Sequence, residues 1–365
     1  MISSPTLLLD KEKCLRNIGF MAGKAKGFGL KLRPHFKTHQ SAEIGEWFRD
    51  FGISSCTVSS MKMAEYFKNH GWNDITLAFP INILEIDAIN AIAAEINLNS
   101  IIVSTKTLDD LNQQLKSPLG LYIKINTGAN RTGIEPENIS LIDKLLEKIS
   151  ANDLMKFKGF LAHSGQTYAA RNKEEIEKIH AQEIQIMAAL KQKYINVFPE
   201  IEISVGDTPA CSVSENYKGI SEIRPGNFVF YDLMQVQIGS CNFDDIAIAL
   251  ASPVVAKHPE RNEIIIHGGA VHLSKEYIFL ENGEKSFGSI VILNENHTWG
   301  QPIKGAYLRS LSQDHGIIKT DSKEVFDSFT EGSLIGILPV HSCLTADMLK
   351  SFLTTDGKKM EMMKW

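Results

Sequence analysis

The feature that most constrains the fold of this chain is a regular alternation of short apolar stretches with longer amphipathic segments between residues 30 and 224. The apolar stretches have the length and composition of strands, and they are Leu30–His35, Ile53–Val58, Ile75–Ala78, Ile101–Val103, Leu121–Ile125, Lys158–Leu161, Glu202–Val205 and Ser221–Arg224. The segments between them, such as Met61–His70 and Lys173–Tyr194, place apolar residues at helical spacing. Because strands alternating with helices are typical of parallel βα units, eight strands in about two hundred residues predict a closed (β/α)8 barrel. An open, doubly wound sheet is the alternative, since strand order cannot be read from the sequence.

A second pattern begins near Tyr231, where short β-rich stretches are separated by Gly, Asn and Pro. Strands are expected at Val236–Ile238, Ala247–Val255, Glu263–His267, Gly288–Leu293 and Leu334–Pro339. One amphipathic helix is expected at Thr345–Leu353. We therefore predict two domains. Residues 1–230 would form the barrel domain, which includes a short strand at Thr6–Leu9, and residues 231–365 a mainly β domain whose C-terminal helix could return to the barrel.

Composition narrows the class of protein. The chain has 365 residues, of which 43% are hydrophobic and 22% are charged, as in ordinary soluble enzymes. The net charge of -5 gives no reason to expect nucleic acid or an anionic membrane as a partner. The 5 cysteines are scattered, which argues against a disulfide scaffold and for a reducing compartment. With no signal-peptide pattern and no bilayer-length apolar run, a cytoplasmic location is expected.

A single lysine, Lys37, follows the first of the barrel stretches, with His35 and His39 on either side. Ser41 has the character of a helix N-cap, so we expect Lys37 where a strand hands over to a helix. A lysine in a dry pocket loses its charge easily, and a neutral amine attacks aldehydes such as that of pyridoxal phosphate (PLP). A surface lysine in a loop is the alternative that this stretch alone leaves open.

Polar and glycine-rich segments follow four of the later strands. They are Asn126–Gly133, His163–Tyr168, Gly206–Pro209 and Arg224–Asn227. In a parallel barrel these segments would share the rim that carries catalytic residues, and the loops after the last two strands are where phosphate usually binds. Backbone N–H groups beside a hydroxyl favour an anion, so Gly206–Pro209 could form a phosphate cup that Gly226 and Asn227 close; an ordinary turn is the alternative.

Two side chains of this rim could contact an aromatic cofactor. Arg131 lies between Gly128 and Gly133 on a tight loop, from which its guanidinium could reach a phenolate oxygen. The hydroxyl of Tyr168 could meet a pyridine nitrogen. Each has a plain alternative, a surface cation for Arg131 and a core residue for Tyr168.

The expected β domain contains one pair of metal-binding residue types, His341 and Cys343. Separated by one residue on an extended chain, the two side chains would point the same way. Imidazole and thiolate together suit zinc, and two protein ligands leave coordination positions open for a substrate. A buried free cysteine beside a hydrogen-bonded histidine is the alternative. His315, next to Asp314, belongs to a further polar cluster of ambiguous role.

Taken in order along the chain, these motifs resemble the family of D-threonine aldolases and D-serine dehydratases. The matching segments are Pro34–His39, Arg131–Gly133, His163–Tyr168, Gly206–Pro209, Glu222–Asp232, Ser312–Gly316 and His341–Cys343. Members are fold-type III PLP enzymes with an alanine-racemase-like fold. The resemblance therefore implies an α/β chain, with a PLP-binding (β/α)8 barrel of the alanine-racemase N-terminal type followed by a mainly β domain.

The resemblance also implies roles for individual residues. Lys37 would carry PLP as a Schiff base and act in catalysis, Arg131 would lie at the cofactor's O3′ and Tyr168 at its ring. The implied phosphate-binding residues are Gly206, Asp207, Thr208, Gly226 and Asn227. His341 and Cys343 would hold a divalent metal, zinc in the first instance, with Mn²⁺ or Mg²⁺ as alternatives.

His-x-Cys is typical of the dehydratase-like members, whereas the aldolases tend to carry His-x-Asp. The resemblance thus implies a lyase that removes water from a D-3-hydroxy amino acid such as D-serine, giving a keto acid and ammonia, and a homodimer. Retro-aldol cleavage to glycine and an aldehyde is the alternative, followed by an amino-acid racemase or a non-catalytic PLP-binding protein. The acid–base candidates are His35, His39, His163 and His315. The chain departs from the family at Gln166, Asp314 and Val340, where histidine, glutamate and asparagine are common.

Overall fold

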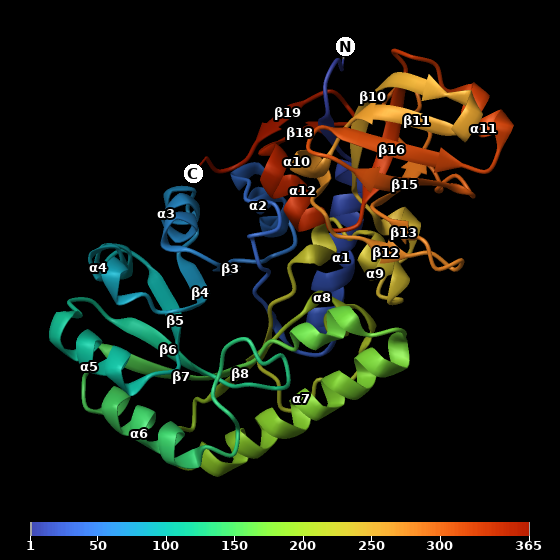
Figure 1. Cartoon of the computed structure of the whole chain (residues 1–365). Helices are drawn as coiled ribbons and strands as arrows, with labels where there is room; N and C mark the ends of the chain where they lie inside the picture. The colour runs from blue at the N-terminus through green and yellow to red at the C-terminus, as the bar shows by residue number, and fades with distance from the viewer. Residues whose placement is uncertain (1, 365) are drawn as a thin grey trace. The chain divides into compact units, whose positions relative to one another are not determined.

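The computed structural model describes residues 2–364, which fall into two compact units (Figure 1). One unit comprises Gly19–Lys37 and Ile44–Gly226, and the other comprises residues 2–18, Thr38–Glu43 and Asn227–Lys364. This division differs from the predicted domains chiefly at the N-terminus. The first strand, β1 (Thr6–Leu9), pairs antiparallel with β10 (Ile248–His258) and so belongs to the β-rich unit.

The first unit is an eight-stranded parallel barrel with the strand order β2-β9-β8-β7-β6-β5-β4-β3. The strands are β2 (Lys31–Leu32), β3 (Cys56–Val58), β4 (Asp74–Pro80), β5 (Asn97–Ile102), β6 (Leu119–Lys124), β7 (Met155–Leu161), β8 (Glu202–Val205) and β9 (Glu222–Ile223). Beyond β2, His35 pairs in parallel with Thr57, and the amide of Phe36 donates to the Thr57 carbonyl oxygen, so the sheet closes on itself. The predicted parallel barrel is confirmed.

Helices alternate with these strands, as the apolar periodicity predicts. They are α1 (Lys11–Gly27), α2 (Ala42–Arg49), α3 (Met61–Asn69), α4 (Ile86–Ala93), α5 (Thr105–Gln114), α6 (Ile139–Ser150), α7 (Lys173–Tyr194) and α8 (Thr208–Val213). Side-chain caps fix where several of them begin: Asn138 accepts from the Leu141 amide at the start of α6, and Asn172 caps α7 in the same way. In Figure 1, α5 and α6 run side by side on the outside of the barrel strands.

A buried charged network fills the interior of this barrel. The Arg33 side chain donates from Nε to Glu222 Oε2 at 2.6 Å and from Nη1 to Asp74 Oδ1 at 2.7 Å. The second oxygen of Glu222 accepts from the Ser204 hydroxyl at 2.6 Å. Because Arg33 and Glu222 are both buried, removing Arg33 would leave the Glu222 carboxylate without a cationic partner, whereas removing Glu222 would leave Arg33 paired with Asp74 alone.

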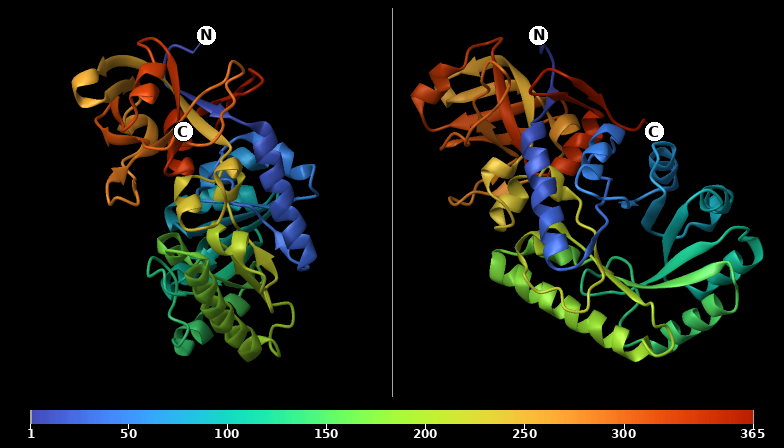
Figure 2. Two further views of the ribbon diagram at one scale, coloured as in Figure 1. Left: turned by 90° about the vertical axis from the view of Figure 1, so that its right-hand side faces the viewer. Right: turned by 180° about the vertical axis from the view of Figure 1, so that it is seen from behind.

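The second unit is built around a closed antiparallel barrel, in which β10 pairs with β11 to complete the order β11-β16-β15-β14-β17-β10. The further strands of this ring are β11 (Glu263–His267), β14 (Gly288–Val291), β15 (Ala306–Leu311), β16 (His315–Thr320) and β17 (Leu334–Pro339). β1 extends the sheet beyond β10, followed by β18 (Ser351–Thr354) and β19 (Lys359–Glu361). The two views of Figure 2 show the blue N-terminal strand against the orange and red strands of this unit.

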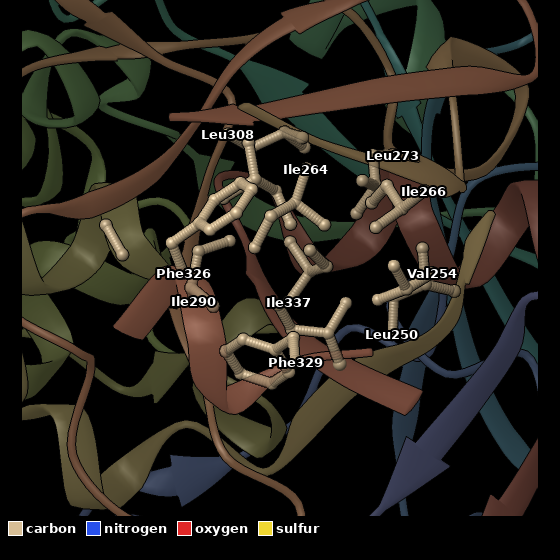
Figure 3. Packing of buried hydrophobic residues seen from close by; sticks show 13 residues of the cluster. Leu250, Val254, Ile264, Ile266, Leu273, Ile290, Leu308, Phe326, Phe329 and Ile337 are labelled. Atoms are coloured by element: carbon tan, nitrogen blue, oxygen red, sulfur yellow. The ribbon is translucent and has the colours of Figure 1, made fainter. Parts of the chain in front are cut away.

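Aliphatic side chains from every strand of the ring meet in one core (Figure 3). Leu250, Ile266, Ile290 and Ile337 are fully buried there, and Phe326 of α11 (Lys323–Ser328) packs against the same cluster. The remaining short elements of the unit are α9 (Leu233–Gln237), α10 (Ala270–Leu273), β12 (Ile278–Phe279), β13 (Lys285–Ser286) and α12 (Ser342–Leu349). None of the helices among residues 2–364 is long and apolar enough to cross a membrane.

Two predictions in this unit are wrong. The strand expected at Val236–Ile238 is replaced by α9, because the Asp232 side chain accepts from the Gln235 amide and caps a helix in spite of the β-branched residues that follow. The helix expected at Thr345–Leu353 begins earlier, at Ser342, and ends where Lys350 adopts a left-handed conformation with φ 57°. The residues after Lys350 form β18 instead.

Candidate functional site

Lys37 lies just beyond β2 in the barrel unit, where the sequence predicts it. Its neighbour Phe36 is fully buried and anchors the segment, with its ring centroid 4.8 Å from those of Phe67 and Trp72. The Lys37 amide donates to His35 Nδ1 at 3.4 Å. The Lys37 side chain itself is exposed rather than enclosed, which corrects the expectation of a dry pocket around this amine.

A buried lysine is nevertheless present in the same barrel. Lys124 is the last residue of β6, only 4% exposed, and its Nζ has no hydrogen-bond partner among the described residues. Burial, together with the nearby charges of Arg224 and Arg131, lowers the pKa of Lys124 to about 7, whereas the carboxylate of Glu183 acts in the opposite direction. Burying a charge without a partner is costly, so this position favours an anion.

Other basic groups face the same region. The guanidinium of Arg224 is buried and donates to the Ala162 carbonyl oxygen at 2.6 Å, and burial lowers its pKa. Burial and the charge of Lys37 lower the pKa of His35 well below its usual range. Burial and the charge of Lys124 lower the pKa of His163 to about 3. Both imidazoles are therefore neutral near pH 7 and are weak bases.

The loop after β8 has the form of an anion cradle. A Cβ on Gly206 would lie 2.5 Å from the backbone nitrogen of Arg224, so only glycine fits this close approach. The Thr208 amide donates to the Tyr168 hydroxyl at 3.3 Å, and Thr208 Oγ1 is buried without a hydrogen-bond partner in the described part of the chain. The Asp207 carboxylate is turned towards its own helix, where it accepts from the Ala210 amide at 2.8 Å. The Tyr168 hydroxyl thus meets the backbone at Thr208, while the side chain of Asp207 caps α8.

Arg131 is exposed on the loop after β6. Asn126 shapes this loop by accepting from the amides of Gly128 and Asn130. At Gly133, with φ 116°, a Cβ would lie 2.7 Å from the Asn126 nitrogen, so the turn requires glycine. The tight loop expected from the two glycines is therefore present, and Arg131 influences the pKa of both His35 and His163.

The predicted metal pair belongs to the β-rich unit, at the junction between β17 and α12. His341 is extended, but Cys343 lies in the first helical turn, so the expectation that both residues occupy an extended chain is wrong. His341 Nδ1 lies 2.7 Å from Glu276 Oε2, and the Cys343 thiol donates to Thr38 Oγ1 at 3.4 Å. Although burial opposes the charge, hydrogen bonds to Cys343 and Glu276 raise the pKa of His341 to about 11.

The surroundings of this pair are polar and ordered. Asn227 Nδ2 donates to Asp232 Oδ2 at 2.7 Å and to the Ser342 hydroxyl at 2.9 Å, and it lies 3.7 Å from Cys343 Sγ. Its side-chain amide is thus committed here, and Asn227 belongs to the β-rich unit whereas Gly226 ends the barrel unit. No group of three or more His, Cys, Asp or Glu side chains in residues 2–364 is arranged to hold a metal. A metal held by His341 and Cys343 would therefore keep open positions.

The remaining histidine candidates differ in environment. His39 is fully buried in the β-rich unit, where its Nδ1 accepts from the Ser41 amide at 3.1 Å, and burial lowers its pKa to about 3. His315 is exposed at the start of β16, opposite His267 of β11.

Sequence reasoning missed Lys124 and Glu276. A usable signal existed for Lys124, since it is an ionisable residue inside the apolar run of β6. The sequence gives no signal for Glu276, because 65 positions separate it from His341 and no motif links the two residues.

Two protein-family models match this chain. The family model described as "Alanine racemase, N-terminal domain" matches residues 9–233. The chain belongs to this family. A second model, described as "Putative serine dehydratase domain", matches residues 247–355. Both the resemblance noted from the sequence and the expected fold class are thereby confirmed.

Similar proteins of known name are dehydratases and aldolases that act on D-amino acids, and the chain compares with them as follows. It is 26% identical to the D-serine dehydratase of Dictyostelium discoideum, over 96% of this chain and 93% of the relative. The chain is also 20% identical to the D-threonine aldolase of Arthrobacter sp, over 93% of this chain and 86% of the relative. The solved structure of D-threo-3-hydroxyaspartate dehydratase from Delftia sp. HT23 shares the fold with a TM-score of 0.89 at 23% identity, covering 100% of this chain and 99% of that one.

Proposed function

We propose that the chain is a PLP- and divalent-metal-dependent lyase that removes water from a D-3-hydroxy amino acid, of the D-serine dehydratase type. The observation that carries this proposal is the amine of Lys124, which is buried without a hydrogen-bond partner among the described residues of the barrel unit that also carries Lys37. Such a site is electrostatically incomplete until an anion binds. PLP is an anion with an aldehyde, and it therefore satisfies both the charge and the reactive lysine.

The residues present fit this cofactor. Lys37 would hold the cofactor covalently. Its phosphate would bind to the backbone at Gly206 and Gly226 and to the hydroxyl of Thr208, which has no hydrogen-bond partner among the described residues. Arg131 would meet O3′ and Tyr168 would lie beside the ring and the Thr208 amide. Asp207 and Asn227 would contribute through their backbone or by shaping the cup, since their side chains have other partners.

His341 and Cys343 fit a divalent metal. An imidazole and a thiol joined by a hydrogen bond are the donor set that zinc prefers, with Mn²⁺ and Mg²⁺ as weaker matches to sulfur. Two solved variants of D-threo-3-hydroxyaspartate dehydratase give further support: a cysteine-to-alanine mutant, solved in a metal-free form, and a histidine-to-alanine mutant two positions earlier in that chain. The spacing is the one between His341 and Cys343.

The chain's own residues would bind the substrate, orient it and transfer its protons. When bound, PLP withdraws electrons from the substrate Cα, and the metal makes the β-hydroxyl a better leaving group. Lys37, once displaced by the substrate amine, would take the Cα proton through Nζ. His35 and His163 have lowered pKa values and would stay neutral, so they would orient groups through hydrogen bonds. For D-serine, loss of one water and later uptake of another gives pyruvate and ammonia, which balances the reaction.

The two sets of residues are connected along the chain. Lys37 immediately precedes Thr38, whose hydroxyl oxygen accepts a hydrogen bond from Cys343. This hydrogen bond lies within the β-rich unit, to which both Thr38 and Cys343 belong. We further propose a homodimer in the cytoplasm, where the described cysteines, which form no disulfide, would stay reduced; light scattering and fractionation test these points.

Retro-aldol cleavage is the second candidate, favoured by the aldolase names among the relatives. Product analysis separates the two. Purified holoenzyme is incubated with D-serine, D-threonine and D-threo-3-hydroxyaspartate, with and without a chelator. Keto acid with ammonia supports dehydration, whereas glycine with an aldehyde supports cleavage. Activity that survives complete metal removal contradicts the metal half of the proposal, and no turnover of any of the three contradicts the lyase.

A further inference from the structure

Glu276 makes a direct contact with the proposed metal ligand. Its Oε2 lies 2.7 Å from Nδ1 of His341, which leaves Nε2 as the ring nitrogen available to a metal. The Glu276 side chain is 40% exposed and that of His341 is 28% exposed, so solvent weakens the ionic attraction between them. The geometry of the hydrogen bond, rather than its charge, is therefore what the pair offers.

Glu276 is held in place by the turn that follows α10. Its amide donates to the Ser274 hydroxyl at 3.2 Å, and Ser274 adopts a left-handed conformation with φ 67°. Residues other than glycine rarely adopt this conformation, and they do so where the surrounding structure imposes it. α10 also packs against α12, the helix that His341 precedes. The carboxylate is thus presented to the imidazole by a constrained turn instead of a flexible loop.

We propose that Glu276 is a positioning residue that keeps His341 in the Nδ1–H tautomer and fixes its ring plane, so that Nε2 is presented to the metal together with Cys343. This inference rests on the metal half of the proposed function. A ligating histidine whose other nitrogen is held by a carboxylate binds more tightly, because the ring no longer loses orientational freedom and the correct tautomer is already present.

The expected effect is on metal affinity. Loss of an outer partner of a ligating histidine typically costs about 10–100-fold in affinity. We expect Glu276→Ala to weaken zinc binding within that range, with turnover recovering at saturating zinc. Glu276→Gln should lose about tenfold at most, because the amide oxygen still accepts from Nδ1–H. The absorbance of the lysine-bound cofactor should be unchanged in both, which also reports that each variant is folded.

The experiment uses holoenzyme stripped of metal and titrated with zinc against a competing chelator. A second readout is the alkylation of Cys343 by iodoacetamide, followed by mass spectrometry, since bound metal protects the thiol. Glu260→Ala is the matched control: His258 and Glu260 form another exposed pair, 3.5 Å apart, in the same unit. His341→Ala defines complete loss of the site.

The outcomes separate cleanly. Weaker zinc binding in Glu276→Ala, a smaller effect in Glu276→Gln and none in Glu260→Ala support the inference. Unchanged zinc affinity in Glu276→Ala, in a protein whose zinc is lost in His341→Ala, overturns it. Equal and complete loss in Glu276→Gln and His341→Ala also overturns it, because Glu276 would then be a ligand. Zinc retained by His341→Ala refutes the metal assignment itself.

Discussion

The replacement of Lys124 by methionine tests the electrostatic argument for the barrel site directly. Methionine is unbranched and of similar length, so Lys124→Met removes the charge while keeping most of the packing of the stem. In the cofactor-free protein the amine of Lys124 is buried and lacks a hydrogen-bond partner within residues 2–364. We therefore expect the variant to be more stable than the parent, which is the reverse of the usual result of a core substitution.

The size of the effect follows from the pKa. Burial lowers the pKa of Lys124 from 10.5 to about 7. At about 1.4 kcal/mol per pH unit, keeping the lysine charged in the folded state costs on the order of 5 kcal/mol below pH 7. Because the unfolded chain still binds the proton above pH 7 and the folded chain does not, this cost declines as the pH rises towards 10.5. The advantage of Lys124→Met should shrink by about 2 kcal/mol between pH 6.5 and pH 8.5.

Urea denaturation of both cofactor-free proteins at these two pH values measures the difference. Comparing variant with parent removes the contributions of ionisable groups that do not interact with Lys124. Lys106→Met is the control, since that side chain is 82% exposed, and it should change stability by no more than about 0.5 kcal/mol. A Lys124→Met protein that is less stable than the parent, or a difference that does not vary with pH, would refute the reasoning.

Three further predictions concern single residues. Lys37→Ala should lose both turnover and the visible absorbance of the lysine-bound cofactor, and a retained covalent band would show that another lysine carries it. Cys343→Ala should lose bound zinc, measured by atomic absorption, while keeping that band; equal zinc content in variant and parent speaks against a metal at this position. Glu222→Ala should destabilise the fold by about 1–3 kcal/mol in urea denaturation, because the buried Arg33 charge loses one of its two carboxylate partners and keeps only Asp74. A loss below about 1 kcal/mol would mean that water replaces the carboxylate.

The barrel could be predicted from the sequence because its pattern is local. Each strand of the barrel is a short apolar run, and each is followed by a helix whose cap or apolar stripe lies within a few residues. For β1, the local pattern predicts a strand but not its pairing partner. Its residues Leu7, Leu8 and Leu9 are buried on both faces, so the apolar run says that it is a strand but not which sheet it joins. Pairing with β10 depends on residues more than two hundred positions away.

The candidate site likewise contains residues that the sequence indicates and residues that it does not. Lys37, His341 and Cys343 stand out from their immediate neighbours, whereas the groups that tune them do not. The Glu276 partner of His341 and the burial of Lys124 beside Arg224 arise from tertiary contacts between distant segments. Exposure could not be read from the sequence either, and it assigns the buried amine to Lys124 and the exposed one to Lys37.

The two units carry opposite electrostatic deficits, and this argues for two different bound groups. In the barrel, the amine of Lys124 is buried and lacks a hydrogen-bond partner among the described residues, so this position favours an anion. In the β-rich unit, a histidine and a cysteine are hydrogen-bonded to each other and backed by Glu276, so the missing species is a cation that prefers nitrogen and sulfur. A racemase of the same fold would need the anion alone. The presence of a metal-ligand pair in the chain therefore favours a lyase over a racemase.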